Sequence, residues 1–351
     1  MYKKLLRPIF FLLNPEKAHH LVVWFVKSSK FFPFSRFLFR KIFEVKHESL
    51  CTNVWGLNFK NPVGLAAGFD KNADFFAEFS GFGFSFIEIG TVTPEAQLGN
   101  PKPRLFRLIS DNGLINRMGF NNKGINYVKK QLEKKKKIEI IIGGNIGKNT
   151  STPNEMAIND YILAFNGLYN YVDYIAINIS CPNVSNLREL QSGKSLSCII
   201  EAILKERLKY DKKKPVLLKV SPDLNNEQLT ETLEIAEILG IDGYIATNTT
   251  TSRDGLITNS NKITSIGNGG LSGKPLTSKS TEVIRVIHDR TKGTKPIIGV
   301  GGIFTTEDAI EKLEAGASLI QIYSGFIYEG PFIVKRINKG LVKYYTRNYY
   351  S

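Results

Sequence analysis

The chain has 351 residues, of which 42% are hydrophobic, and its formal net charge is +15. This length allows one large hydrophobic core or two ordinary ones. The three cysteines and four histidines form no CxxC pair and no short Cys/His spacing, which argues against a disulfide framework and a zinc site, so we expect no bound metal.

The positive charge is concentrated in residues 1–46. This segment has 10 Lys/Arg against 2 Asp/Glu, a net charge of +8, and 9 of the 23 phenylalanines. Its apolar runs IFFLL and LVVWFV are shorter than a signal-peptide core and far shorter than the roughly 20 residues of a spanning helix. Interleaved aromatic and basic residues without a nucleic-acid-binding signature favour an anionic membrane surface as the partner, and not nucleic acid. The alternative is an extension packed on the following domain.

Two helices are predicted within residues 1–46. Asn14 and Pro15 are typical of a helix cap and first turn, and this helix should run to about Lys30, before Pro33. The stretch FSRFLFRKIF predicts a second, short helix. We therefore predict an amphipathic helical pair in residues 1–46, followed by a catalytic unit in residues 47–351.

After residue 50, short apolar runs alternate with helix-like segments such as NEQLTETLEIAEILG and TTEDAIEKLEAG. The apolar residues of these runs follow one another almost without interruption, which is typical of parallel strands that are covered on both faces. Eight strand–helix units in about 290 residues predict an α/β fold, a (β/α)8 TIM barrel. A doubly wound sheet is the alternative, but it does not need eight strands. The eight runs cover residues 61–69, 84–91, 138–146, 172–180, 215–221, 242–250, 296–302 and 317–325.

Seven of these runs end in amides, amines, hydroxyls or glycines. In a (β/α)8 barrel the strand ends form one rim, which holds the active site, so we predict a large polar ligand there. GVGG (299–302) and SG (324–325) occupy the usual phosphate-binding position of such barrels, and GGLSG (269–273) predicts another loop in close contact with the ligand. Neither a P-loop nor a Rossmann fingerprint is present.

Two lysines and several asparagines narrow the type of ligand. Lys71 and Lys219 at strand ends predict an anionic ligand with more than one negative region. The asparagines suit a flat heterocycle with alternating donors and acceptors. A Schiff-base role for Lys71, as in aldolase barrels, is the weaker alternative because aldolase chemistry does not require so many amides.

The motifs in this order resemble the dihydroorotate dehydrogenase family, in particular its membrane-associated class, which passes electrons to a quinone. The resemblance covers essentially the whole chain and implies oxidation of dihydroorotate to orotate in pyrimidine biosynthesis by an FMN-containing barrel. It rests on NPEKAHH, GLAAGFDK, PKPRLFRL, GLINRMGFNN, LLKVSPD, ATNTT, GGLSGKPL, IIGVGGI and GASLIQIYSG.

The resemblance also implies residue roles. It places FMN contacts at Ala67, Gly68, Lys71, Thr91, Asn145, Asn178, Lys219, Thr247, Gly273, Gly302, Tyr323 and Ser324. It places substrate contacts at Lys71, Asn116, Arg117, Met118, Gly119, Phe120, Asn178, Asn183, Asn248 and Thr249. Cys181 would be the general base, and His19 and Arg107 would line the quinone path.

The catalytic loop departs from the quinone-linked pattern. That class usually has serine where this chain has Cys181, and a threonine where it has Val184. Cysteine is typical of the soluble class, so a soluble acceptor such as fumarate or NAD is the alternative to quinone. A non-enzymatic basic barrel that binds membrane or nucleic acid is the third hypothesis. For the quinone-linked hypothesis we expect a peripheral protein on the cytoplasmic face of the inner membrane, without an obligate protein partner.

Overall fold

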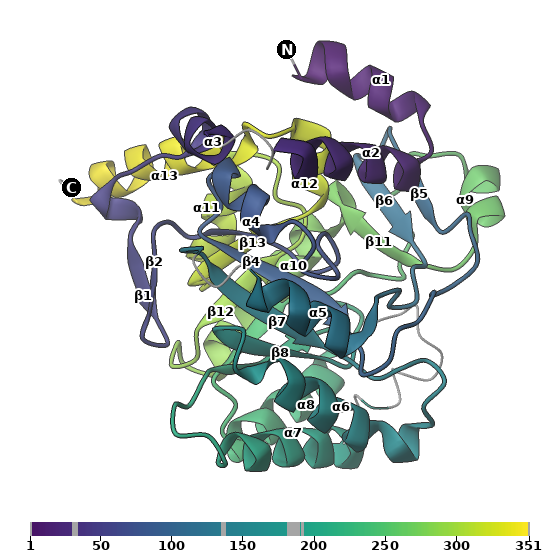
Figure 1. Cartoon of the computed structure of the whole chain (residues 1–351), viewed down its shortest axis with the longest axis vertical. Coiled ribbons are helices and arrows are strands. Elements are labelled where there is room, and N and C mark those ends of the chain that lie inside the picture. Colours follow the sequence, from purple (N-terminus) through teal and green to yellow (C-terminus); the bar gives the residue numbers. More distant parts are fainter. Residues whose placement is uncertain (1, 30–33, 135–137, 181–189, 191–192, 350–351) are drawn as a thin grey trace.

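Eight parallel strands close into a barrel, with helices around it, in the computed structural model of this chain (Figure 1). The structure describes residues 2–29, 34–134, 138–180, 190 and 193–349. The order around the barrel is β10-β12-β13-β3-β4-β7-β8-β9. Each predicted run coincides with one barrel strand, with Phe86–Val92 extending one residue past its run, which confirms the (β/α)8 fold.

The barrel strands are short and parallel. Their bounds are β3 Val63–Leu65, β4 Phe86–Val92, β7 Ile141–Ile146, β8 Tyr174–Asn178, β9 Val216–Val220, β10 Gly243–Ala246, β12 Ile297–Val300 and β13 Leu319–Ile322. The helices that follow residue 46 are η3 Glu48–Leu50, α4 Phe76–Phe79, η4 Ser80–Phe82, α5 Gly124–Glu133, η5 Asn154–Met156, α6 Ala157–Tyr169, α7 Gly193–Arg207, α8 Asn226–Leu239, α9 Ser260–Ile266, η7 Lys274–Leu276, α10 Thr277–Arg290, α11 Thr306–Glu314, α12 Ser324–Glu329 and α13 Ile333–Tyr349.

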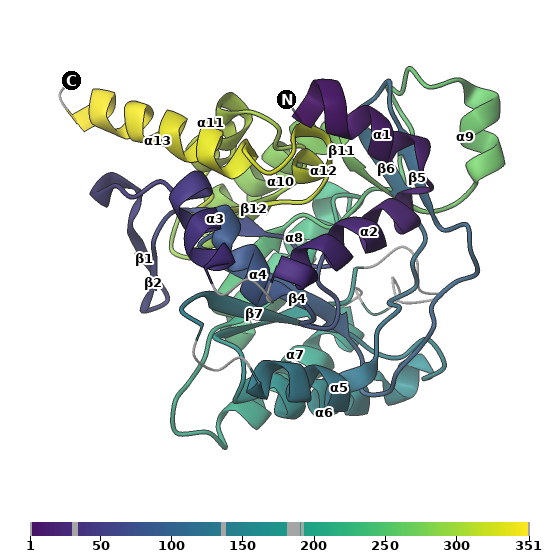
Figure 2. The ribbon, with the colours of Figure 1, turned by 45° about the horizontal axis from the view of Figure 1, so that its top comes forward.

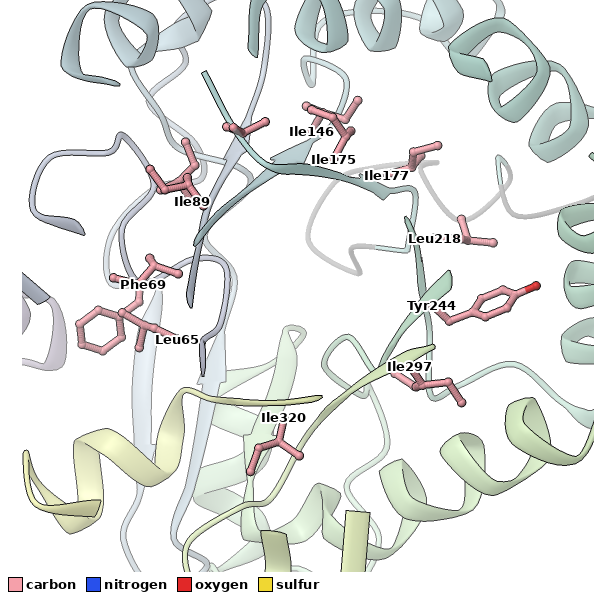
Figure 3. Packing of buried hydrophobic residues seen from close by; sticks show 14 of the residues in the cluster. Leu65, Phe69, Ile89, Ile146, Ile175, Ile177, Leu218, Tyr244, Ile297 and Ile320 are labelled. Atoms are coloured by element: carbon pink, nitrogen blue, oxygen red, sulfur yellow. The ribbon is translucent and has the colours of Figure 1, made fainter. Parts of the chain in front are cut away.

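The strands bury both of their faces, which explains why their sequences are almost continuously apolar. Figure 3 shows Ile177, Leu218 and Tyr244 on the outer side of the strand ring, toward the helices. The alternate residues, among them Tyr174 and Leu217, belong to a second cluster in the barrel interior. The interior is therefore a packed core below the site.

Two small antiparallel sheets lie outside the barrel, and the sequence patterns did not predict them. The hairpin of β1 (Thr52–Val54) and β2 (Leu57–Phe59) packs Val54 and Phe59 against the interior cluster. The second sheet has the order β11 (Gly270–Gly273), β6 (Gly113–Asn116), β5 (Leu105–Leu108). This second sheet brings the GLIN and GLSG segments side by side, because β6 pairs with β11.

The predicted helical pair is present in the N-terminal segment. The side chain of Asn14 accepts a hydrogen bond from the Glu16 amide at 3.0 Å and caps α2, which spans Pro15–Ser28. The second helix is α3, Ser35–Phe43. A preceding helical segment, η1 (Tyr2–Leu6) with α1 (Arg7–Leu12), was not predicted. No helix in the described residues is long and apolar enough to cross a membrane.

A buried ion pair fixes α2 to the strand-end side of the barrel. Arg104 Nη2 lies 2.8 Å from Glu16 Oε1, and Arg104 Nε donates to Oε2 at 3.4 Å. Burial alone would raise the pKa of Glu16, but the hydrogen bond and charge of Arg104, with Lys102, outweigh burial and lower it. Breaking such a pair leaves an uncompensated charge, so the position of α2 is well defined. Figure 2 shows α2 crossing in front of the barrel near β5.

Candidate functional site

A cavity opens where the barrel strands end, as the motifs predicted. Its wall comes from the ends of seven barrel strands together with β6, β11 and the loops around them. The predicted ligand contacts in this wall are Ala67, Gly68, Lys71, Thr91, Asn116, Met118, Gly119, Phe120, Asn178, Lys219, Thr247, Asn248, Thr249, Gly273, Gly302, Tyr323 and Ser324. The structure therefore brings residues 250 positions apart in the chain to one site.

A chain of buried amides runs across the floor of this cavity. Asn178 Nδ2 donates to Thr91 Oγ1 at 2.9 Å and to Asn145 Oδ1 at 3.2 Å. Asn248 Nδ2 donates to Asn178 Oδ1 at 3.1 Å and to Ser180 Oγ at 3.0 Å. Asn145 is fully buried beneath the cavity wall and orients the other amides. Such a hydrogen-bonded set holds its donors and acceptors in fixed directions before a ligand arrives.

Glu88 is a buried charged residue next to the predicted site that the motif analysis missed. It is 0% exposed and its carboxylate faces Lys219, with Oε1 3.5 Å from Nζ. Asn145 Nδ2 donates to Oε1 at 2.8 Å, and Gln321 Nε2 donates to Oε2 at 2.8 Å. The signal in the sequence was the lone acid within the apolar run FSFIEIGT. A charge inside a buried strand requires a partner, and here the partner is a predicted ligand-binding lysine.

The glycines after β12 form a close-packed backbone loop. A Cβ on Gly302, where φ is +71°, would lie 2.0 Å from Thr277 Oγ1. Thr277 Oγ1 donates to Gly302 O at 3.0 Å, and Ser272 Oγ lies 2.9 Å from Ser324 Oγ. Burial raises the pKa of neighbouring Tyr323 to about 12, so its hydroxyl stays protonated at neutral pH. The loop offers backbone and hydroxyl groups, as the predicted phosphate site requires.

A second cavity of about 570 Å³ lies between α2 and the barrel. Its size is within the range of small-molecule pockets. Its walls are mostly apolar and come from η1, α1, α2 and the barrel loops. Gly68, Lys71, Met118 and Tyr323 line both cavities, so the two cavities adjoin at these residues. Lys71 Nζ donates to Asn121 Oδ1 at 2.6 Å at this boundary.

His19 and Arg107, the predicted quinone-side residues, both line the second cavity. The ring of His19 meets Phe69 edge-on, with centroids 5.2 Å apart. Burial, then the charges of Lys71 and His20, lower the pKa of His19 to about 3, so the imidazole is neutral. Arg107 Nη1 donates to Leu13 O at 2.7 Å, and its guanidinium lies 4.5 Å from the Phe11 ring centroid. Arg107 thus connects α1 to the cavity.

Of the other predicted site residues that the structure describes, Arg117 does not line the strand-end cavity. The guanidinium of Arg117 points away from it and donates to Ile266 O and, at 3.1 Å, to Pro103 O. Cys181 and Asn183 lie outside the described residues.

Comparisons with a family model, with relatives in sequence and with solved structures all point to the same protein family. Residues 49–344 match the family described as dihydroorotate dehydrogenase. A protein from Christiangramia forsetii named dihydroorotate dehydrogenase (quinone) is 51% identical over 344 residues, 98% of this chain and 99% of the relative. One of the same name from Proteus mirabilis is 47% identical, covering 96% and 99%. A crystal structure of DHODH from Eimeria tenella in complex with ferulenol has a TM-score of 0.86 at 36% identity, covering 95% of this chain and 92% of that chain.

Proposed function

This chain belongs to the dihydroorotate dehydrogenase family, and from that premise we propose which of its residues carry the reaction. The enzyme oxidises dihydroorotate to orotate in pyrimidine biosynthesis, with a quinone as the electron acceptor. The observation that best supports this function is the pair of adjoining cavities. One lies at the strand ends and has lysines and amides in its wall, the other lies under α2 with mostly apolar walls, and Lys71 borders both. Two such sites suit a reaction with a polar donor and an apolar acceptor.

The enzyme is flavin-dependent, and we propose that its flavin is FMN, held in the strand-end cavity. Bound flavin would supply the hydride acceptor of the reaction. The loop at Gly302 and Ser324 suits the phosphate, and Lys219 with the Asn145–Asn178 amides suits the polar edge of a flat ring. The proposed contacts are those predicted above, Ala67, Gly68, Lys71, Thr91, Asn145, Asn178, Lys219, Thr247, Gly273, Gly302, Tyr323 and Ser324.

Dihydroorotate must lose a proton from one ring carbon and a hydride from the next. We propose that Cys181 removes the proton and that Lys71 binds the substrate carboxylate. Asn116, Asn178 and Asn248 would hold the ring amides, because their side chains can donate and accept hydrogen bonds at the same time. The further proposed contacts are Arg117, Met118, Gly119, Phe120, Asn183 and Thr249, of which Arg117 would have to reorient its guanidinium.

We propose that residues 1–46 form the membrane- and quinone-binding unit and residues 47–351 the catalytic barrel. The exposed side chains of Leu12, Trp24 and Phe37 suit a peripheral attachment to a membrane. The +8 charge of this segment suits anionic lipids, as on the cytoplasmic face of an inner membrane. The quinone would enter the apolar cavity between α1 and α2 and end beside Lys71.

Steady-state assays with different electron acceptors test this function. With dihydroorotate as the donor and detergent present, we expect rapid reduction of a short-chain quinone and negligible reduction of fumarate or NAD. Turnover with fumarate and not with quinone would instead support the soluble-acceptor alternative, which the Cys181 loop suggests.

Replacing His19 with alanine is expected to raise the KM for the quinone by about two- to tenfold. The change removes one hydrogen-bonding group from the apolar cavity, and one such bond contributes about 0.5–1.5 kcal/mol. Because the pKa of His19 is about 3, this residue stays neutral between pH 5 and 8 and should cause no change in the wild-type KM for quinone over that range. Quinone titrations at fixed dihydroorotate concentration measure the effect.

The control for this variant is His47→Ala, which changes an exposed histidine in the loop before η3. Dihydroorotate-dependent reduction of a soluble dye should keep its rate in both variants. An unchanged quinone KM in His19→Ala would remove His19 from the acceptor site.

A further inference from the structure

The helix α13 carries a dense positive charge that the reaction does not use. Its 17 residues include five lysines and arginines and no acidic residue. Arg336, Lys339, Lys343 and Arg347 are all exposed. Their spacing of three or four residues places them along one side of the helix. The stripe of these four residues is called the basic stripe below.

The opposite side of α13 is anchored to the protein. Ile333, Val334, Ile337 and Leu341 are fully buried, so the helix cannot turn its basic stripe inward. Only Arg336 of the stripe has an ion pair in the described residues, with Glu329 at 2.6 Å. The cations at 339, 343 and 347 face solvent.

The helix α13 lies beside α3 of the proposed membrane-binding segment. The ring of Phe332, next to the start of α13, lies 4.9 Å from that of Phe43, and Lys335 Nζ donates to Ile42 O. Both views of the ribbon show the two helices next to each other (Figures 1 and 2). The segment 1–46 therefore continues into a surface formed by a helix almost 300 residues later in the chain.

The combined surface is basic and partly apolar. The helices α3 and α13 together contain eight lysines and arginines and no carboxylate. Glu44 and Glu48 follow α3, while Glu314 and Glu329 approach α13 and already bind Tyr344 and Arg336. The side chains of Phe34 and Phe37 are 76% and 69% exposed at the start of α3. Exposed aromatics next to cations suit lipid better than nucleic acid.

We propose that the basic stripe of α13 binds the headgroups of anionic lipids and is a second membrane contact of this enzyme. The cations at 339, 343 and 347 neutralise lipid charge while the apolar side chains of α3 enter the interface. This contact goes beyond the function proposed above, because none of the residues proposed for dihydroorotate oxidation lies on α13. Each cation near an anionic surface contributes about fivefold in affinity at low salt.

Neutralisation of the stripe tests the proposal. The full-length variant Lys339→Gln/Lys343→Gln/Arg347→Gln is compared with wild type in cosedimentation with phosphatidylcholine vesicles that contain phosphatidylglycerol. We expect the variant to bind at least tenfold more weakly, with the difference vanishing in salt high enough to screen charges. Binding to pure phosphatidylcholine vesicles should not differ.

The matched control neutralises three exposed lysines elsewhere, Lys130→Gln/Lys134→Gln/Lys212→Gln, at α5 and beyond the end of α7. The helices α5 and α7 lie away from α13 in Figure 1. A general charge effect would weaken binding equally in both triple variants and would overturn the proposal. The proposal would also be overturned if the stripe variant bound vesicles as tightly as wild type does. It would be overturned, too, if the basic stripe were needed to bind an RNA or DNA duplex and not to bind vesicles.

Two further measurements separate this contact from folding and from catalysis. The variant Lys339→Arg/Lys343→Arg keeps the charge and should bind vesicles as wild type does. Reduction of a soluble dye with dihydroorotate in detergent should be unchanged in the stripe variant. Loss of vesicle binding with full dye reduction supports the proposal even if quinone is not the acceptor. Loss of dye reduction in the stripe variant would show a structural defect and overturn it.

Discussion

Replacing Cys181 with alanine is expected to lower kcat for dihydroorotate oxidation by about 10²- to 10⁴-fold, the usual contribution of a general base. Without the thiolate, the substrate proton must pass to a weaker base such as water, so proton removal and hydride transfer both slow. Anaerobic mixing of enzyme with dihydroorotate, followed by flavin absorbance, measures this half-reaction directly. The second half-reaction, oxidation of the reduced enzyme by quinone, should keep its rate.

The pH dependence provides an independent check on Cys181. A thiol has a reference pKa of about 8.5, so the fraction of thiolate, and with it kcat/KM, should rise with pH up to this region. In Cys181→Ser the reaction should need a higher pH, since a hydroxyl gives up its proton far less readily. The control is Cys198→Ala, at a partly buried thiol of α7. Rapid flavin reduction in Cys181→Ala would show that another group is the base.

Replacing Glu88 with leucine is expected to lower the free energy of unfolding by about 3–5 kcal/mol. The change leaves the ammonium of Lys219, which is only 6% exposed, without its counter-charge in the barrel interior. It also removes the acceptor for Asn145 Nδ2 and Gln321 Nε2. Urea unfolding followed by circular dichroism measures the loss.

A double-mutant cycle separates the ion pair from the side-chain volume. Glu88→Leu/Lys219→Met should cost less than the sum of the two single variants, because the double variant leaves no unpaired buried charge. Glu139→Gln is the surface control, since Glu139 lies 3.7 Å from Lys60 with its side chain 83% exposed. Its effect should be below about 1 kcal/mol. Additive costs for Glu88 and Lys219 would mean that the two charges do not interact.

The barrel could be predicted from the sequence because each of its strands is marked by a pattern of neighbouring residues. Each strand is a short apolar run, and the helix at Pro15 has its own cap in Asn14, so both can be recognised without any contact partner. The predictions missed η1 with α1 and the strands β5, β6 and β11. The strands β6 and β11 are separated by about 150 residues, and their pairing has no local signature.

The functional site, too, has a part that could be predicted from the sequence and a part that could not. Residues at strand ends could be assigned from the sequence because barrel closure brings all such ends to one rim. This argument places Thr91, Asn178 and Lys219 together, and the cavity contains all three. It does not fix the direction of a side chain, as Arg117 illustrates. Its neighbour Asn116 lines the cavity, whereas Arg117 bonds to carbonyls on the other side of its strand end.

The eight-stranded barrel, the rim that holds the site and the basic, aromatic character of residues 1–46 could all be predicted from the sequence alone. Periodicity, caps and composition are properties of neighbouring residues, so they can be read along the chain. Three contacts became visible in the folded chain and not before: Glu88 faces Lys219, α2 closes an apolar cavity beside Lys71, and α13 lies next to α3. These are contacts between segments from about 50 to nearly 300 residues apart. They depend on how the barrel closes and on which surfaces are left for packing, and no local pattern encodes either.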